Sequence, residues 1–307
     1  MTILATGAAG FIGSNVVHTL VRQGHTVIAL DHFKVGTPDR LKGFSGTIIQ
    51  ADICTFNWES VKEGLDGVIH EAAITDTTIT DERLMLAVNT EAFARLLDFA
   101  KRAKIRVVYA SSAGVYGNGE VPMRETNPMT PENIYGVSKM KMDELTKVYM
   151  REHPDLRIVG LRYFNVYGPG EQHKGNAASM MWQLSLQMKA GKRPRIFKYG
   201  EQKRDFVYVK DVATATIAGL SAKTSGVVNV GSGKTETFNR VIEVLNKVLG
   251  YSYQAEYFDN PYSFYQNETL ADISAAGALL GYQPAYTLDT GIADYFSNQE
   301  SEVRSQK

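Results

Sequence analysis

Cysteine is nearly absent from this sequence of 307 residues, because Cys54 is the only one. A lone cysteine excludes a disulfide within the chain and a metal site built from several thiolates, and it fits a reducing compartment. No apolar run approaches the length that crosses a bilayer, and the chain opens on a strand-like segment instead of a signal sequence. We therefore predict a cytoplasmic protein with no metal centre and no membrane contact.

An excess of charge of one sign is missing as well. The chain has 33 Lys and Arg residues and 33 Asp and Glu residues. No overall field therefore attracts nucleic acid, and we predict no nucleic-acid partner. The sequence is 44% hydrophobic, which suits one large or two small domains with an ample core.

Short apolar runs alternate with amphipathic stretches from residue 1 to about 165. Predicted strands lie at 3–6, 26–30, 47–50, 67–70, 106–110 and 157–163, and long helices at 81–102 and 131–152. This alternation is typical of βαβ units. It predicts an α/β fold with a doubly wound parallel sheet of the Rossmann type.

The regular alternation of predicted strands and helices ends beyond residue 168. An irregular polar stretch comes first, and the later predicted elements are strands near 204–209 and 227–230 and helices near 180–188, 211–220, 238–249 and 272–280. We expect a dinucleotide-binding domain of residues 1–167 plus about 205–225. A smaller, interleaved C-terminal substrate-binding lobe would contain residues of about 168–204 plus 226–307.

A glycine-rich turn directly follows the first predicted strand and opens a helix. Its glycines, Gly7, Gly10 and Gly13, have the spacing G-x-x-G-x-x-G, with Phe11 and Ile12 between the last two. Glycines let the backbone approach a pyrophosphate, which then sits on the amides and positive dipole of the helix N-terminus. A glycine turn without a ligand is the alternative, but the strand before and the helix after favour a dinucleotide.

Asp31 ends the second predicted strand, eighteen residues after Gly13. Its carboxylate is placed to accept a hydrogen bond from a ribose 2′-hydroxyl, and it repels a 2′-phosphate. This favours NAD over NADP, although Lys34 or Arg40 could reverse the preference. We predict a tightly bound NAD or NADP, with His32 and Lys34 also in contact with it.

Later turns at the same sheet edge would complete the cofactor site. Asp52 and Ile53 follow the third strand and could border the adenine, with a plain turn as an almost equal alternative. His70 ends the fourth strand, and a histidine there is more often packed in the core than catalytic. The small residues after it, Ala72 and Ala73, would allow the cofactor to pass closely.

Tyr135 and Lys139 lie four residues apart and hence on one face of the second long helix. A cation within about 4–6 Å can lower the pKa of a phenol from about 10 by a unit or more, although such pairs also occur by chance on surface helices. Ser112 follows the fifth strand, where its hydroxyl could bond a substrate and relay a proton to Tyr135. With Lys139 also holding the nicotinamide ribose, the three residues predict hydride transfer at a carbon bearing a hydroxyl.

These motifs resemble the extended short-chain dehydrogenase/reductase family of nucleotide-sugar epimerases and dehydratases over nearly the whole chain. Within that family, the segments 162–169 (RYFNVYGP), 171–175 (EQHKG) and 203–209 (KRDFVYV) resemble the ADP-glyceromanno-heptose 6-epimerases. The resemblance implies a nucleotide-diphosphate sugar as substrate. It also implies a homodimer or higher homo-oligomer, in which the two long helices could pair with their copies.

By this resemblance Asn165 contacts the substrate and Arg204 binds its diphosphate. Lys174 would be a second acid/base across the sugar from Tyr135, because inversion needs either such a group or a ketone that reorients; an exposed loop lysine is the alternative. The further implied cofactor contacts are Asn89 and Val166, and the further implied substrate contacts are Thr75, Asn176, Gln183, Phe197 and Tyr265.

The leading prediction is NAD(P)-dependent epimerisation by transient oxidation, reorientation of the ketone or aldehyde, and re-reduction. A UDP-hexose 4-epimerase acting on glucose or galactose would use the same Tyr135 and Ser112 at another carbon. A nucleotide-sugar 4,6-dehydratase is disfavoured, because Ala113 and Gly114 stand where such enzymes carry an Asp-Glu pair. A non-catalytic NAD(P)-sensing protein would use the fold for binding only.

Overall fold

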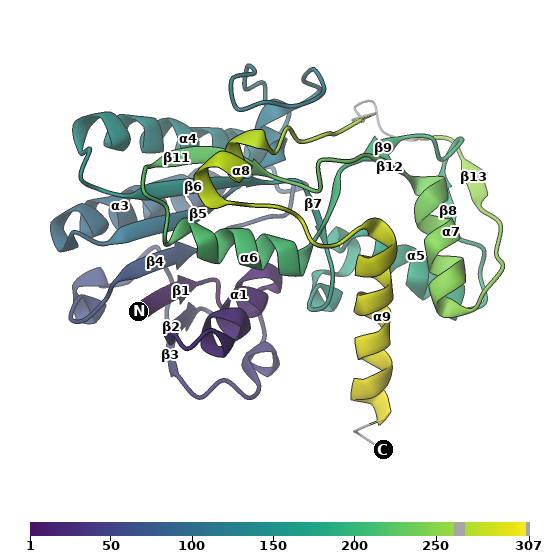
Figure 1. The fold of residues 1–307 in the computed structure, drawn as a ribbon, viewed down its shortest axis with the longest axis horizontal. Helices are drawn as coiled ribbons and strands as arrows, with labels where there is room; N and C mark the ends of the chain where they lie inside the picture. The colour runs from purple at the N-terminus through teal and green to yellow at the C-terminus, as the bar shows by residue number, and fades with distance from the viewer. Residues whose placement is uncertain (261–267, 305–307) are drawn as a thin grey trace.

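A seven-stranded parallel sheet forms the centre of the computed structural model, which describes residues 1–260 and 268–304 (Figure 1). The strand order is β11-β6-β5-β4-β1-β2-β3. The strands are β1 (Thr2–Thr6), β2 (Thr26–Asp31), β3 (Thr47–Gln50), β4 (Gly67–His70), β5 (Arg106–Ser112), β6 (Ile158–Tyr163) and β11 (Gly226–Val230). The predicted Rossmann-type fold is confirmed. The order reverses between β1 and β4, which is where such sheets bind ligands.

Helices cover both faces of the sheet (Figure 1). The first face carries α1 (Phe11–Arg22) and α6 (Val209–Gly219), and the second carries α3 (Ala92–Ala103) and α4 (Ile134–Glu152). Side chains alternate along each strand, so neighbouring residues join opposite halves of the core. In β1, for example, Ile3 packs on the α1 and α6 side, whereas Leu4 packs on the α3 side.

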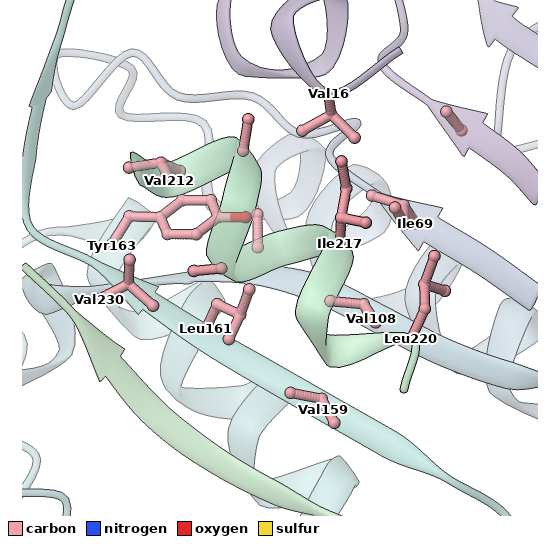
Figure 2. Packing of buried hydrophobic residues seen from close by; sticks show 14 of the residues in the cluster. Val16, Ile69, Val108, Val159, Leu161, Tyr163, Val212, Ile217, Leu220 and Val230 are labelled. Atoms are coloured by element: carbon pink, nitrogen blue, oxygen red, sulfur yellow. The ribbon is translucent and has the colours of Figure 1, made fainter. Parts of the chain in front are cut away.

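The core beneath α6 is apolar and tightly filled. Figure 2 shows Val159 and Leu161 of β6 facing Ile217 and Val212 of α6. Tyr163 extends from the end of β6 toward the same helix (Figure 2), and its hydroxyl lies 2.7 Å from the Thr216 hydroxyl of α6. A polar contact is therefore built into the apolar layer close to the carboxyl edge of the sheet.

The first long helix is divided into three parts. It consists of α2 (Glu82–Leu86), a π-helical turn (Ala87–Glu91) and α3. Asn89 is buried in the wide turn, where its amide bonds the backbone of Ile74 and the Ser138 hydroxyl. The second long helix, α4, begins at Ile134 and not at 131, because the Asn133 side chain caps the Gly136 amide at 2.8 Å.

The smaller lobe has its own apolar core around α5 (Met180–Lys189), α7 (Phe238–Leu249) and α9 (Leu288–Arg304). Its strand pairs are β7 (Asn165–Tyr167) with β10 (Phe206–Tyr208), β9 (Lys203–Arg204) with β12 (Glu236–Thr237), and β8 (Arg195–Phe197) with β13 (Glu256–Phe258). One predicted strand, 204–209, is thus two strands separated by Asp205. The buried Asp205 carboxylate causes the break, because it accepts bonds from the amides of Ser232, Gly233 and Ala271.

The structure differs from the predicted division in several elements. Strands β7 and β10 pack in the core of the smaller lobe, whereas our division assigned their residues to the dinucleotide-binding domain. Strand β11 belongs to the central sheet, whereas our division assigned its residues to the smaller lobe. Helix α8 (Ser274–Leu280) packs on β11 and α6 as well. Otherwise the two-lobe division stays a prediction. Within the described ranges, no helix combines the length and the apolar character that a membrane span needs.

An ion pair buried between α4 and the sheet fixes the position of that helix. Arg162 Nε lies 2.8 Å from Asp143 Oδ2, and both side chains are at most 1% exposed. The hydroxyl of Tyr109 donates to the other Asp143 oxygen at 2.8 Å, and Arg162 donates to the Tyr116 hydroxyl at 2.7 Å. Every group of the pair is thereby satisfied, which is what a buried charge requires.

We predict that Asp143→Asn destabilises the protein by about 3–5 kcal/mol, because the variant leaves the Arg162 charge buried without a counter-charge. Urea unfolding measures the effect. The matched control is Glu152→Gln, which removes the exposed ion pair with Arg151 near the end of the same helix and should change the stability little. Equal effects of the two variants would contradict this account.

Candidate active site

The glycine turn between β1 and α1 packs against itself and against the end of β4. Gly7 has φ +63°, and a Cβ added there would lie 2.7 Å from the amide nitrogen of Ala72. A Cβ added at Gly13 would lie 2.0 Å from the Gly7 carbonyl oxygen. Neither space admits a side chain, so the path of this turn requires glycine at both positions.

The N-terminus of α1 is suited to a phosphate group. Its N-cap, Gly10, has no side chain to bond the first amides, and the first turn of this described helix contains no acidic residue. The Ser14 amide donates to the Gly10 carbonyl at 3.0 Å, which is the first hydrogen bond of the helix. The amides before it and the positive end of the helix dipole thus fit the pyrophosphate of a dinucleotide.

The Asp31 carboxylate braces this turn. One of its oxygens accepts from the Ala9 amide and the other from the Phe33 amide, both at 2.9 Å. His32 Nδ1 lies 3.6 Å from Asp31, and Lys34 Nζ lies 4.0 Å from Asp52. The residues predicted to surround the adenosine therefore gather at one edge of the sheet, although their contacts with a cofactor stay a prediction.

The other predicted cofactor residues occupy the neighbouring strand ends. Ile53 is buried in the core on the α3 side, beside β3. Ala72 donates its amide to the Thr6 hydroxyl at 3.3 Å, which places the segment of Ala72 and Ala73 against β1. His70 stacks on a phenylalanine, and burial lowers its pKa to about 3, so it is a neutral core histidine.

Three of the four predicted catalytic side chains, those of Ser112, Tyr135 and Lys139, lie together where β5 meets α4. Ser112 ends β5, and its hydroxyl bonds the Tyr135 side chain and accepts from the Gly114 amide at 3.0 Å. Lys139 is only 2% exposed, and its ammonium donates to the Ala110 carbonyl at 2.7 Å. Its Nζ atom lies 5.8 Å from the centroid of the Tyr135 ring. A proton can thus move between a substrate hydroxyl and this cluster.

Our prediction that Lys139 lowers the pKa of Tyr135 is wrong for the protein alone. Burial of the phenol raises its pKa, the Ser112 hydrogen bond lowers it, and the charge of Glu71 raises it. The pKa of Lys139 itself is lowered to about 8 by burial, which Glu71 and Asp143 oppose. Desolvation is the largest cause of both shifts, because both groups are withdrawn from water.

Glu71 is a site residue that the sequence reasoning missed. It follows β4 directly and is half-buried, and its carboxyl oxygen lies 2.7 Å from the Tyr163 hydroxyl. Burial raises its pKa to about 7, while Tyr163 and Lys139 lower it. An acidic residue immediately after a fully buried strand was the sequence signal that could have drawn attention to it.

Lys174 lies on the cofactor side of the site. Its Nζ atom is 5.6 Å from the centroid of the Phe11 ring, at the start of α1. The loop is held by the buried carboxylate of Glu171, which accepts from the Gly168 amide at 3.1 Å and the Ser179 hydroxyl at 2.8 Å. Burial lowers the pKa of Lys174, and Glu171 opposes the shift. Its role as a second acid/base across the sugar stays a prediction.

Two of the predicted substrate residues are joined through the segment at 268–269. The Thr269 hydroxyl donates to Asn165 at 3.1 Å, and the Thr269 amide donates to Lys203, next to Arg204. Gln183 donates to the Asn176 carbonyl at 2.8 Å. Of the other predicted substrate residues, Thr75 is exposed, Phe197 packs on Phe258, and Tyr265 lies outside the described residues. Val166, a predicted cofactor contact, packs on the core.

A Rossmann sheet, a glycine turn suited to a phosphate and a Ser-Tyr-Lys cluster are the features expected of a dinucleotide-dependent enzyme that acts on a hydroxyl group. The chain belongs to the NAD dependent epimerase/dehydratase family, whose model matches residues 3–231.

More particularly, the chain is 36% identical to ADP-L-glycero-D-manno-heptose-6-epimerase of Alkalilimnicola ehrlichii, over 95% of this chain and 96% of that protein. The crystal structure of the Helicobacter pylori ADP-L-glycero-D-manno-heptose-6-epimerase aligns with a TM-score of 0.91 and 39% identity, over 98% of this chain and 96% of the other. UDP-glucuronic acid 4-epimerase from Bacillus cereus, in complex with NAD, aligns with a TM-score of 0.86 and 30% identity, over 97% and 99%. The predicted enzyme class, an NAD-dependent nucleotide-sugar epimerase, is confirmed.

We predict that Gly13→Ala weakens dinucleotide binding by about tenfold or more, equivalent to at least about 1.4 kcal/mol, because its Cβ would displace the Gly7 carbonyl and open the turn. Fluorescence titration with NAD measures the affinity. Gly277→Ala is the control, since its Cβ would meet its nearest neighbour, the Tyr282 carbonyl oxygen, at an ordinary 3.6 Å. Unchanged affinity in Gly13→Ala would exclude the turn as the binding site.

Proposed function

We propose that this protein inverts a carbon of a nucleotide-diphosphate sugar as an ADP-L-glycero-D-manno-heptose 6-epimerase. The observation that carries the proposal is the meeting of Ser112, Tyr135 and Lys139 beside the glycine turn. The similarity to two heptose epimerases over nearly the whole chain supports this substrate over others.

In this proposal Tyr135 exchanges a proton with the substrate hydroxyl, and Ser112 orients that hydroxyl. Bound NAD would supply the chemistry of accepting and returning a hydride. The raised pKa of Tyr135 favours the phenol form, so the residue is well suited to return the proton when the carbonyl is reduced again. Lys139 would hold the nicotinamide ribose with the two ammonium protons that its bond to Ala110 leaves.

The finer assignments belong to the same proposal. We expect tightly held NAD and not NADP, because Asp31 ends β2 with a carboxylate that would repel a 2′-phosphate. We expect Arg204 to bind the diphosphate and Asn165 to contact the sugar. A homodimer could form through α3 and α4, and the single cysteine fits a cytoplasmic enzyme.

The substrate assignment is tested by incubating the protein with ADP-heptose, UDP-glucose and UDP-galactose and following inversion by NMR. We expect inversion of ADP-heptose, and a loss of about 10²–10⁴-fold in Tyr135→Phe. The control is Tyr149→Phe, which alters a tyrosine on the same helix that bonds the surface residue Asp98. Dehydration or net reduction of NAD would contradict an epimerase, and full activity of Tyr135→Phe would indicate non-catalytic binding.

A UDP-hexose 4-epimerase is the second candidate, favoured by the close match to a solved UDP-sugar 4-epimerase. Lys174→Ala discriminates between the two. If Lys174 is the second acid/base, kcat falls by about 10²-fold or more with unchanged NAD affinity. The control is the exposed Lys192→Ala. Retained kcat with weaker NAD binding would assign Lys174 to the cofactor, next to Phe11, and would remove the two-base argument for a heptose substrate.

A further inference from the structure

Glu71 begins a chain of hydrogen bonds that runs from the active site into α6. Its carboxyl oxygen lies 2.7 Å from the Tyr163 hydroxyl. That hydroxyl lies 2.7 Å from the Thr216 hydroxyl, which lies 2.8 Å from the Val212 carbonyl. Figure 2 shows how Tyr163 reaches from β6 to α6 beside Val212. The proposed reaction uses none of these groups, so their role is open.

The protons of this chain can be counted. Three oxygen–oxygen links need three hydrogens, and the hydroxyls of Tyr163 and Thr216 supply two. If Glu71 is ionised, one link joins two oxygens without a hydrogen between them. If Glu71 carries a proton, it donates to Tyr163, Tyr163 donates to Thr216, and Thr216 donates to the Val212 carbonyl. Only the protonated carboxyl group satisfies every link.

We propose that Glu71 is held as a neutral carboxylic acid that donates a hydrogen bond to Tyr163. Glu71 is then a positioning residue, and its ionisation changes the electrostatic environment of Lys139 and Tyr135. Loss of the proton adds a negative charge that acts on the Lys139 ammonium. The same charge disfavours the phenolate of Tyr135.

The surroundings of Glu71 support this role. The charged and titratable groups that act on it are Tyr163 of β6 and Lys139 of α4, and it acts in turn on Tyr135 of α4. Burial raises its pKa to about 7. Asp143, the other carboxylate that acts on Lys139, is already paired with Arg162. Glu71 belongs to none of the ion pairs in the described part of the chain, so no ion pair fixes its charge near neutral pH.

The direct test needs no substrate and is therefore independent of the proposed function. Urea unfolding is compared for the purified protein and Glu71→Gln between about pH 5 and about pH 8. The Gln amide can donate to Tyr163 as the neutral acid does, but it cannot ionise. Because the pKa of the carboxyl rises from about 4.3 in the unfolded chain to about 7 in the folded protein, folding takes up a proton.

We therefore consider the ratio of the folding equilibrium constant of the wild type to that of Glu71→Gln. As the pH rises from about 5, this ratio should fall by about tenfold per pH unit, and it should level off above about pH 7. The exposed Glu63→Gln gives the baseline. A ratio that does not change with pH would overturn the proposal, because it would mean that Glu71 ionises alike in the folded and unfolded chains.

Thr216→Val provides a second variant that keeps Glu71. Without the Thr216 hydroxyl, Tyr163 has Glu71 as its acceptor, which favours the carboxylate. With Thr216→Val we expect the ratio of folding equilibrium constants to level off at a lower pH than in the wild type. If this pH does not move, the proposed direction of the hydrogen bonds, from Glu71 through Tyr163 to Thr216, is refuted. The pH profile of kcat/KM, which does rest on the proposed function, should contain an ionisation near pH 7 that Glu71→Gln lacks.

Discussion

The buried ion pair of Asp143 and Arg162 is the interaction on which the rest of the site depends. Asp143 lies one helical turn after Lys139, and Arg162 lies on the strand next to β5, which carries Ser112. Withdrawing two charges from water is costly, and the cost is offset here by their 2.8 Å contact and by hydroxyl partners on both sides. The pair therefore holds helix α4 in its position on the sheet, and this position brings the predicted catalytic side chains together.

Burial also explains the chemistry of the cluster. The lysine at position 139 has its pKa lowered to about 8, while that of the carboxyl at 71 is raised to about 7. Two groups whose ordinary pKa values differ by about six units thus titrate within a narrow range near neutrality. Proton movement between these two groups then involves a small free-energy difference, whereas Tyr135, whose pKa burial raises, holds its proton more firmly.

Much of the fold, and the clustering of Ser112, Tyr135 and Lys139, could be predicted from the sequence, because they follow local patterns: alternating apolar runs, a glycine turn and a four-residue spacing. Features that arise from long-range contacts could not. The strand break at Asp205 depends on amides far along the chain, and the raised pKa of Tyr135 depends on burial that spacing does not reveal. Glu71 was missed because its partner, Tyr163, lies 92 residues away in the sequence.

The central claim is that this cluster inverts a carbon through hydride transfer and not through removal of a proton from carbon. The most direct test is a nucleotide sugar carrying deuterium at the carbon that inverts, incubated with the enzyme in ordinary water. The account predicts that the inverted product keeps its deuterium at that carbon. Inverted product in which hydrogen from water has replaced the deuterium would contradict the account.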